Sequence, residues 1–163
     1  MIVREASPSE MAEVGELRIA AYRDQHLFDI DSDYPEALRV LGTDGTGHIL
    51  VAAQGETILG TVLLQPWHPS ASELAHDSSE AEIRALAVAP QAQGRGVGAA
   101  LVHAAMRRAA ADEGARRMVL STQPTAWAAQ RLYRSLGFAR LPERDWSPVP
   151  GLNLLAFHRD LPA

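Results

Sequence analysis

Three glycines, Gly94, Gly96 and Gly98, stand close together in the segment PQAQGRGVGAAL, just before an alanine-rich run. Glycine has no Cβ atom and adopts positive φ without steric cost, so its backbone can approach a ligand closely and turn N–H groups into one concavity. A helix that begins near Val97 would add unpaired N–H groups and the positive end of its dipole. The segment therefore favours binding of a phosphate group.

Two familiar phosphate motifs fit this segment poorly. Gly94, Gly96 and Ala99 satisfy the dinucleotide pattern G-x-G-x-x-G/A. In that motif the first glycine closely follows a strand, whereas residues 89–93 intervene here, and the next strand ends at 121–122 without an acidic residue for a ribose. A P-loop requires a lysine, and the chain has none. A tight strand-to-helix connection, with glycines needed only for steric reasons, stays open as an interpretation.

The elements that position this turn are indicated by the spacing of apolar residues. Period-two alternation predicts strands, three- and four-residue spacing predicts helices, and Gly and Pro mark the turns between them. We expect strands at 2–6, 48–54, 57–66, 82–88, 117–122, 138–141 and 152–157, and helices opening at 7–9 and spanning 35–41, 97–113 and 124–136, with a proline-bearing loop at 142–151. This order predicts an α/β (α+β) fold with a central mixed, twisted β-sheet of about six to seven strands flanked by about four helices.

Composition limits the classes of function. The chain has 163 residues, a formal net charge of −5 and no cysteine, and its size suits a single domain, residues 1–163. Without cysteine there are no disulfides, thiolate metal ligands or cysteine acyl-enzyme, and we expect no metal site. The negative charge argues against nucleic acid, and no apolar run reaches the roughly 20 residues that span a membrane. The start MIVREASPSE has no apolar signal core, so we expect a cytoplasmic protein.

Two acidic stretches, 24–36 and 73–82, contain no basic residue. Such stretches can attract a cationic substrate. They can equally be solvated loops that aid solubility. Both interpretations stay open on charge alone.

Two motifs together resemble the GNAT superfamily of acetyl-CoA-dependent N-acetyltransferases. The string EIRALAVAPQAQGRGVGAALVHAAM contains the superfamily's core, a Gln or Arg, two residues, a Gly, one residue and a Gly or Ala, here spanning residues 93–98. The segment AAQRLYRSLGF is similar to the family's A-x-x-L-Y-x-x-x-G-F pattern. The resemblance covers residues 82–138 and implies a GNAT-like acyl-CoA N-acyltransferase fold.

The resemblance implies that acetyl-CoA is the bound phosphate ligand. Its pyrophosphate would be held by backbone N–H groups of Gln93, Gly94, Arg95, Gly96, Val97, Gly98 and Ala99, with Arg95 adding charge at the rim. The strand before the turn would splay from the next one, and backbone at Leu86, Ala87 and Val88 would pair with the pantetheine arm. The Val88 N–H would polarise the thioester carbonyl, a role worth roughly 3 to 4 kcal/mol for one donor.

Acetyl transfer needs a base for the amine, and Glu82 is the first candidate. Family members often carry a glutamate at the matching position, and period-two alternation predicts that Glu82 and Val88 share a face. Arg84 lies on that face as well, and an ion pair with it would make Glu82 a weaker base. In that case the proton would leave through water or through His76 or Asp77 of the preceding loop.

Tyr133 is the candidate acid, because it matches the family tyrosine whose hydroxyl protonates the departing thiolate. The alternative is an aromatic side chain that only closes the core between helix and sheet. One residue departs from the family pattern: many members have an asparagine seven residues before this tyrosine, where this chain has Ala126. That change puts a coenzyme contact from this helix in doubt.

The resulting hypothesis is an N-acetyltransferase that moves an acetyl group from acetyl-CoA to a primary amine of a small molecule or peptide, by direct attack in a ternary complex. The acceptor would lie among 22–28, the acids up to Glu36, 67–68 and Trp146, which suit an amine with an apolar or cationic body. A non-catalytic acyl-CoA-binding or sensing domain is the alternative. Homodimers are common in the family, and no feature of this sequence bears on that state.

Overall fold

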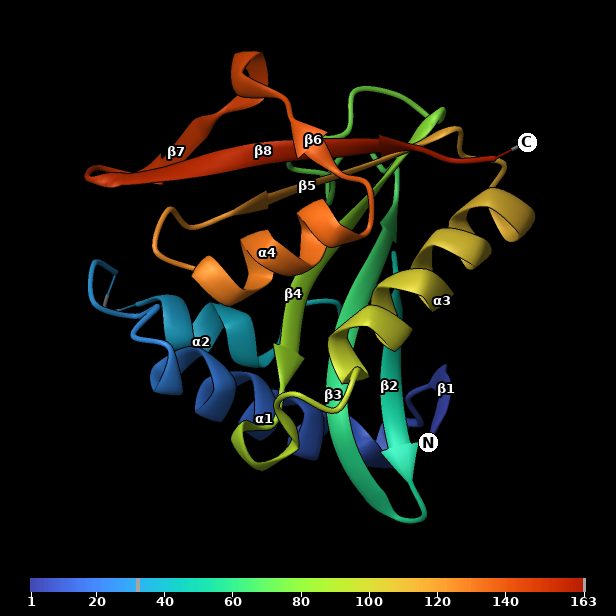
Figure 1. Ribbon diagram of the computed structural model, residues 1–163, viewed down its shortest axis with the longest axis vertical. Coiled ribbons are helices and arrows are strands. Elements are labelled where there is room, and N and C mark those ends of the chain that lie inside the picture. The colour runs from blue at the N-terminus through green and yellow to red at the C-terminus, as the bar shows by residue number, and fades with distance from the viewer. Residues whose placement is uncertain (32, 163) are drawn as a thin grey trace.

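A mixed sheet of eight strands runs through residues 1–31 and 33–162, the part of the chain that this computed structural model describes (Figure 1). The strands are β1 (Ile2–Glu5), β2 (His48–Gln54), β3 (Thr57–Pro66), β4 (Glu80–Val88), β5 (Arg117–Thr122), β6 (Ala139–Arg140), β7 (Trp146–Val149) and β8 (Leu152–Asp160). Their order is β1-β2-β3-β4-β5-β8-β6, with β7 also paired to β8. Only β4 and β5 run parallel; the other neighbours are antiparallel.

Helices cover both faces of this sheet. They are α1 (Met11–Asp24), α2 (Tyr34–Arg39), α3 (Val97–Asp112) and α4 (Trp127–Ser135). Gly60 on β3 is packed against α3, since a Cβ built there would lie 2.8 Å from Val97 Cγ1. Three residues further along β3, Leu63 points to the opposite face. A Cβ built on Gly42, which follows α2, would lie 2.9 Å from Leu63 Cδ1. Thus α1 and α2 lie on one face, and α3 and α4 lie on the other.

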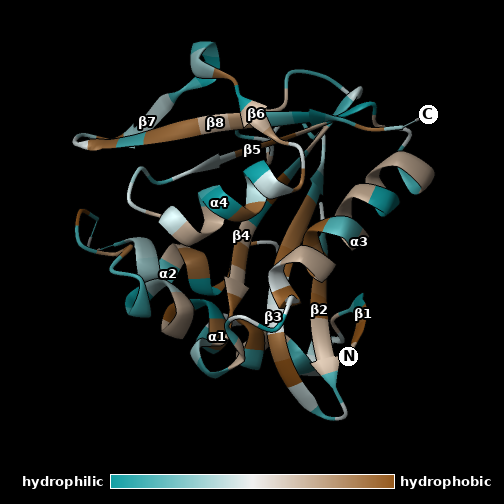
Figure 2. Ribbon diagram, in the orientation of Figure 1, coloured by the Kyte–Doolittle hydropathy of each residue, from teal (hydrophilic) through white to brown (hydrophobic). Residues whose placement is uncertain are grey.

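The central strands are buried on both faces, and their composition follows from that position. All but the first and last residues of β2 and β3 are buried. Figure 2 shows these strands as nearly continuous hydrophobic ribbons, whereas the helices alternate between hydrophobic and hydrophilic faces. A strand covered on both sides needs an unbroken apolar run, which explains why β2 and β3 carry little polar alternation.

The predicted fold class is confirmed, with one more strand than expected. The additional strand β7 lies inside the segment 142–151, which was predicted to be a loop. Pro148 lies within it at the register shift between Trp146 and Val149, and proline is tolerated in strands only at edges or bulges, where no ladder N–H is needed. The helix predicted to open at Pro124 begins at Trp127 instead, and the strand predicted to open at Glu82 begins at Glu80.

A bulge in β4 corrects the alternation argument. Thr61 pairs with Ala87 and Leu63 pairs with Arg84, so three steps on β4 lie against two steps on β3. The extra residue lies beside Ala85, which has a φ of 53°. Because one inserted residue reverses the side-chain alternation, Glu82 and Val88 lie on opposite faces, not on the same face as predicted.

The strands β4 and β5 separate soon after they begin to pair. Their parallel ladder contains only three pairs, and the last joins Glu82 to Val119. Beyond this pair β4 and β5 diverge, as Figure 1 shows. The expected splay between these strands is therefore present, and it leaves the inner edge of β4 without a partner strand.

Candidate active site

A cavity of about 490 Å³ lies where β4 and β5 diverge. Its wall combines the glycine turn, β4, the end of β5, α4 and the segment that joins α1 to α2. The predicted site residues that line it are Glu82, Leu86, Val88, Gln93, Gly94, Gly96, Val97, Gly98, Ala99 and Tyr133. The structure therefore brings both candidate catalytic residues and most of the candidate phosphate turn to one cavity.

The glycine turn has the backbone that an anion site requires. Gly94 and Gly96 have φ values of 76° and 78°, and a Cβ built on either would meet nothing within 4 Å. Gly96 precedes the first turn of α3, and the first helical N–H with a partner is that of Ala100, which donates to the Gly96 carbonyl at 3.1 Å. The N–H groups of residues 97–99 donate no backbone hydrogen bond within the described part of the chain, so the turn fits a phosphate group.

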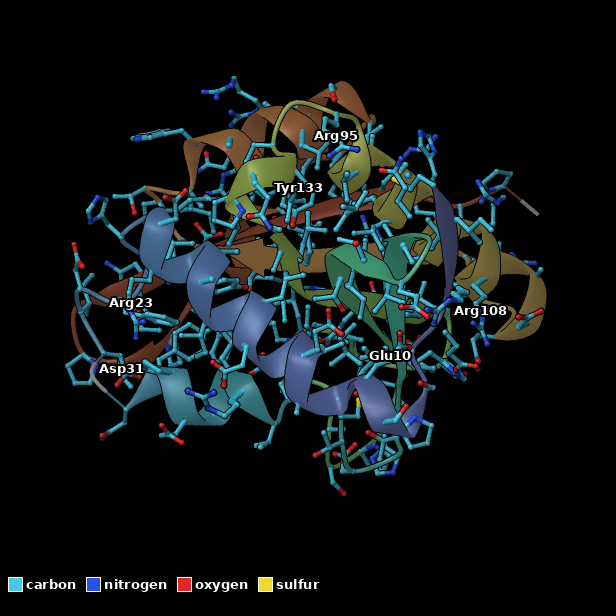
Figure 3. The ribbon with its side chains drawn as sticks, turned by 90° about the horizontal axis from the view of Figure 1, so that it is seen from below. Glu10, Arg23, Asp31, Arg95, Arg108 and Tyr133 are labelled. Carbon is cyan, nitrogen blue, oxygen red and sulfur yellow. The ribbon has the colours of Figure 1, made fainter. Side chains whose placement is uncertain are left out.

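Two predicted coenzyme residues lie away from the cavity wall. The Arg95 guanidinium donates to Gln54 Oε1 at 2.8 Å, which directs it toward the β2–β3 hairpin. The Ala87 side chain is buried in the core. These two side chains therefore do not join the cavity, although Figure 3 shows Arg95 close to the turn that carries it.

The backbone of Val88 points into the gap between β4 and β5. The next N–H, that of Ala89, donates to Leu59 on β3 at 2.8 Å. Successive N–H groups of a strand point to opposite edges. The Val88 N–H therefore points away from β3, and the Ala87 N–H points toward β3. Gln93 Nε2 donates to the Val88 carbonyl at 3.2 Å and fixes the turn to the end of the strand.

Glu82 is almost fully buried, with 2% of its surface exposed. Its Oε1 accepts hydrogen bonds from the backbone N–H groups of Leu74 and Ala75, both at 2.5 Å. Both bonds end on the same oxygen, which leaves Oε2 for the cavity that Glu82 lines. Bonds to backbone N–H groups hold the carboxylate in one orientation and stabilise its charge.

Arg84 does not pair with Glu82, which removes the competing interpretation of Glu82 as part of a structural ion pair. Its Nη2 lies 2.7 Å from Glu73 Oε1, and its Nη1 donates to the Ala71 carbonyl at 3.3 Å. Burial raises the pKa of Glu73, the charge of Arg84 lowers it and the charge of Glu82 raises it. The three side chains therefore form one electrostatic group at the cavity wall.

The other proton acceptors considered from the sequence lie elsewhere. His76 and Asp77 do not line the cavity. The Asp77 carboxylate accepts bonds from the Ser79 hydroxyl and backbone N–H, which lower its pKa. These residues belong to the turn before β4 and are not part of the cavity wall.

Tyr133 is packed in the core and also lines the cavity, so its position is compatible with both interpretations of the sequence. It is 5% exposed, and its ring lies 5.7 Å from that of Phe138 and 6.3 Å from that of Phe157, so it closes the core between α4 and the sheet. It also lines the cavity, and Figure 3 shows it among the packed side chains of the interior. Burial raises the pKa of its hydroxyl, which stays protonated at neutral pH.

The opposite end of the cavity contains Tyr22, from the predicted acceptor segment 22–28, together with residues that the sequence analysis did not single out as acceptor residues. Tyr22 and Tyr34 stand with their ring centroids 5.9 Å apart, and Glu73 and Arg84 complete this wall. Glu73 belongs to an acidic stretch noted in the sequence, but only the folded loop shows that it reaches the cavity. Of the predicted acceptor segments, 67–68 does not line the cavity.

Two long-range hydrogen bonds join segments at this end of the cavity. Trp146 Nε1 donates to the Ser121 hydroxyl at 3.2 Å, and Gln123 Nε2 donates to the Leu27 carbonyl at 2.9 Å. The second bond joins the end of β5 to the segment after α1.

Within residues 1–31 and 33–162 no group of three or more His, Asp or Glu side chains is arranged to hold a metal ion. Nor does that part of the chain contain a helix with the length and hydropathy needed to cross a bilayer.

The comparisons with known proteins agree with this geometry. The family model described as the acetyltransferase (GNAT) family matches residues 11–138, and the chain belongs to this family. No curated protein sequence matches the chain significantly.

Solved structures share the fold over the full chain. A GNAT-family acetyltransferase from Staphylococcus aureus Mu50 has a TM-score of 0.75 and 16% identity, covering 99% of each chain. The ribosomal-protein-alanine N-acetyltransferase of Brucella melitensis has a TM-score of 0.69 and 19% identity, covering 99% of this chain and 100% of its own. The yncA structure from Salmonella typhimurium, which contains its cofactor acetyl-CoA, has a TM-score of 0.67 and 23% identity, covering 100% of this chain and 95% of its own.

Proposed function

We propose that this protein transfers an acetyl group from acetyl-CoA to the nitrogen of a primary amine, in a small molecule or a peptide. The observation that carries the proposal is the single cavity that joins an anion-binding turn, Glu82 and Tyr133. Relatives of the same fold support both halves of it: yncA was solved with acetyl-CoA, and the Brucella protein is described as an N-acetyltransferase.

Acetyl-CoA supplies a thioester whose carbonyl carbon forms a bond to the amine nitrogen while its bond to sulfur breaks. The free backbone N–H groups at residues 94–99 would hold the pyrophosphate. The Val88 N–H, which points into the gap between β4 and β5, would donate to the carbonyl oxygen as negative charge develops there.

Glu82 takes the proton that the amine must lose. An ammonium ion has no lone pair, so it has to give up a proton before attack. Glu82 lines the cavity, and the bonds from Leu74 and Ala75 occupy only its Oε1, so we assign the acceptor role to Oε2. A carboxylate held in this way can receive the proton without turning away from the acceptor.

Tyr133 gives a proton to the departing thiolate. A phenol is protonated at neutral pH, and burial raises the pKa of Tyr133 further, so the hydroxyl carries the proton that a donor needs when sulfur leaves. α4 lies on the opposite face of the sheet from Glu82, so the proton is taken on one side of the gap and delivered on the other.

A screen of primary amines tests the proposal. Acetyl-CoA and the protein are mixed with each amine, and the released thiol is measured with a thiol reagent, which the chain itself cannot consume because it has no cysteine. We expect thiol release that depends on both amine and protein, with the acetyl-amine found by mass spectrometry. A rise in melting temperature with acetyl-CoA but no turnover with any amine would favour the sensing domain instead.

A further inference from the structure

The cavity is electrically polarised at its acceptor end. Glu82 offers one carboxylate oxygen, and Arg84 lies two residues further along β4 on the same face, since their partners on β3 are Gln65 and Leu63. Two steps along a strand span about 7 Å. A negative group and a positive group therefore stand side by side at the distance of a small bifunctional molecule.

A second arginine stands behind this wall, and no carboxylate in the described part of the chain forms an ion pair with it. Arg18 on α1 is 0% exposed, and its Nη1 donates to the carbonyls of Leu38 at 3.0 Å and Leu41 at 2.7 Å. Within the described residues its Nε and Nη2 have no hydrogen-bond partner. A buried guanidinium without a carboxylate is costly, so the fold tolerates a positive charge here that no side chain of residues 1–31 and 33–162 neutralises.

Arg18 and Arg84 act on the same region. Burial lowers the pKa of Arg18 to about 10, the nearby hydroxyls of Tyr22 and Tyr34 raise it, and the charge of Arg84 lowers it. Arg18 therefore remains charged at neutral pH. Tyr22, Tyr34 and Arg84 all line the cavity, which places the field of Arg18 at that wall.

The Arg84 end of this wall leaves one anion to be supplied. Arg18 and Arg84 contribute two positive charges there and Glu73 one negative charge, a net charge of +1, while Glu82 contributes the negative charge of the other end, so the two ends carry opposite charges. A guanidinium has five N–H donors, and Arg84 uses only one toward Glu73 and one toward Ala71. The remaining donors can bind a carboxylate. Asp31 also lines the cavity, but Figure 3 shows it at the outer end of the α1–α2 segment, where solvent screens its charge.

We propose that the acceptor is an α-amino acid with an apolar side chain, whose amine meets Glu82 and whose carboxylate meets Arg84, with Arg18 supplying a buried positive field. This inference rests on the proposed function and names its substrate class. The side chain would lie against the apolar wall formed by Tyr22, Leu27, Tyr34, Trp146 and Leu154. A single zwitterion would then neutralise both ends of the cavity.

Matched acceptors test the substrate class. L-leucine, L-leucinamide and isopentylamine form one set, and L-phenylalanine, L-phenylalaninamide and phenethylamine form another; each is compared by thiol release at equal concentrations of neutral amine. We expect kcat/KM for at least one amino acid to exceed that of its amide and amine by about tenfold or more, because a charge-assisted hydrogen bond is lost in both. Equal or faster use of the amides and amines in both sets overturns the proposal.

Variants of the two arginines locate the carboxylate. In Arg84→Gln and Arg18→Met, the ratio of kcat/KM for amino acid to amine should fall toward one, whereas Arg107→Gln on the exposed side of α3 should keep the parent ratio. An unchanged ratio in Arg84→Gln contradicts the assignment. If Arg18→Met does not fold, the Arg84 variant alone decides.

The failure of this inference can be told from the failure of the proposed function. Turnover of amines without preference for amino acids leaves the acetyltransferase intact and removes the zwitterion site. No thiol release with any acceptor removes the proposed function. In that case the amino acids are tested for binding alone. A rise in the melting temperature of the parent, but not of Arg84→Gln, supports the amino-acid site. No rise in the melting temperature of either protein overturns that site.

Discussion

Glu82 and Val119 form the last pair that joins β4 to β5 before the two strands diverge. The candidate base therefore stands at the vertex of the gap, where the sheet is still closed on one side and open on the other. Its Oε1 is fixed by Leu74 and Ala75, so the loop before β4 is attached to the same point. The position of the carboxylate is set by the sheet and by this loop together.

Replacing Glu82 by Gln should lower kcat/KM for the amine by about 10² or more, since general base catalysis contributes on that scale. The amide oxygen of Gln can still accept the two backbone N–H bonds, so the fold should hold. The deficit should shrink as the pH approaches the pKa of the amine, because more acceptor is then neutral without help. A pH–rate profile for thiol release measures this, with Glu13→Gln on α1 as the control.

If the pH–rate profile of Glu82→Gln coincided with that of the parent protein, Glu82 would not be the base. A loss of stability equal in size to the loss of rate would point to the loop instead. Denaturant unfolding of Glu82→Gln separates these cases, because the loss predicted here is in the rate and not in the free energy of unfolding.

Replacing Tyr133 by Phe should lower kcat by about 10² with little change in the affinity for acetyl-CoA. The ring contacts with Phe138 and Phe157 do not involve the hydroxyl, so the core should remain packed. Stopped-flow measurement of thiol release and calorimetric titration with acetyl-CoA distinguish the two quantities. An unchanged kcat on a good acceptor would leave Tyr133 with a packing role alone.

Replacing Gly96 by Ala should weaken acetyl-CoA binding and also lower the free energy of unfolding by about 1 kcal/mol. The second effect follows from its φ of 78°, which costs any residue with a Cβ. Gly45 is a matched control, since its φ is 82° and it too has open space around a Cβ. Gly45→Ala should lose similar stability and keep the parent Kd, measured by calorimetry; equal affinities in the two variants would contradict the phosphate role of the turn.

The parts of this molecule that the sequence predicted are those fixed by local pattern. The buried strands β2 and β3 need apolar runs, and the turn at Gly94 and Gly96 needs residues without Cβ, so each leaves a direct mark in the chain. The two-motif resemblance added the order of the elements around the turn. These signals were enough for the fold and for the position of the glycine turn, at which we propose that the coenzyme binds.

The missed features depend on contacts between distant segments. The bulge beside Ala85 exists because β4 pairs with β3 over a stretch one residue shorter, and no single residue of β4 indicates it. The counter-ion of Arg84 is Glu73 rather than Glu82, which the loop conformation decides. The buried Arg18 could not be recognised either, since its place between α1 and α2 follows from how those helices pack.

Replacing Ala126 by Asn should tighten acetyl-CoA binding severalfold and raise the free energy of unfolding by about 1 kcal/mol. Ala126 is the N-cap of α4 and lines the cavity, and Asn is among the preferred N-cap residues. Many members of the family are expected to have an asparagine there, and this side chain would restore a polar contact to the coenzyme. The exposed neighbour Thr125 does not line the cavity, so Thr125→Asn should leave the Kd unchanged; a Kd for Ala126→Asn no better than the parent would show that the contact has been replaced.

Replacing Glu80 by Gln should reduce the free energy of unfolding by about 2 kcal/mol at pH 7, because the carboxylate forms charge-assisted bonds. Its Oε1 lies 2.8 Å from Arg144 Nη1 and accepts the His76 N–H at 2.9 Å, and Arg117 lies 3.6 Å from Oε2. Burial raises the pKa of Glu80, and these partners outweigh it, so that the pKa lies below its usual value.

The sign of the pH dependence follows from that lowered pKa. The unfolded chain binds the proton more readily than the folded one, so the contribution of Glu80 is complete above about pH 4.5 and is lost as the pH falls through the lower folded value. Urea unfolding at pH 7 and at pH 3 to 4 should therefore show a steep acid loss in the parent and a shallower one in Glu80→Gln. The exposed control Glu143→Gln should lose stability in acid as the parent does. If the parent and Glu80→Gln lost stability with equal slope, Glu80 would have the same proton affinity in the folded and the unfolded chain.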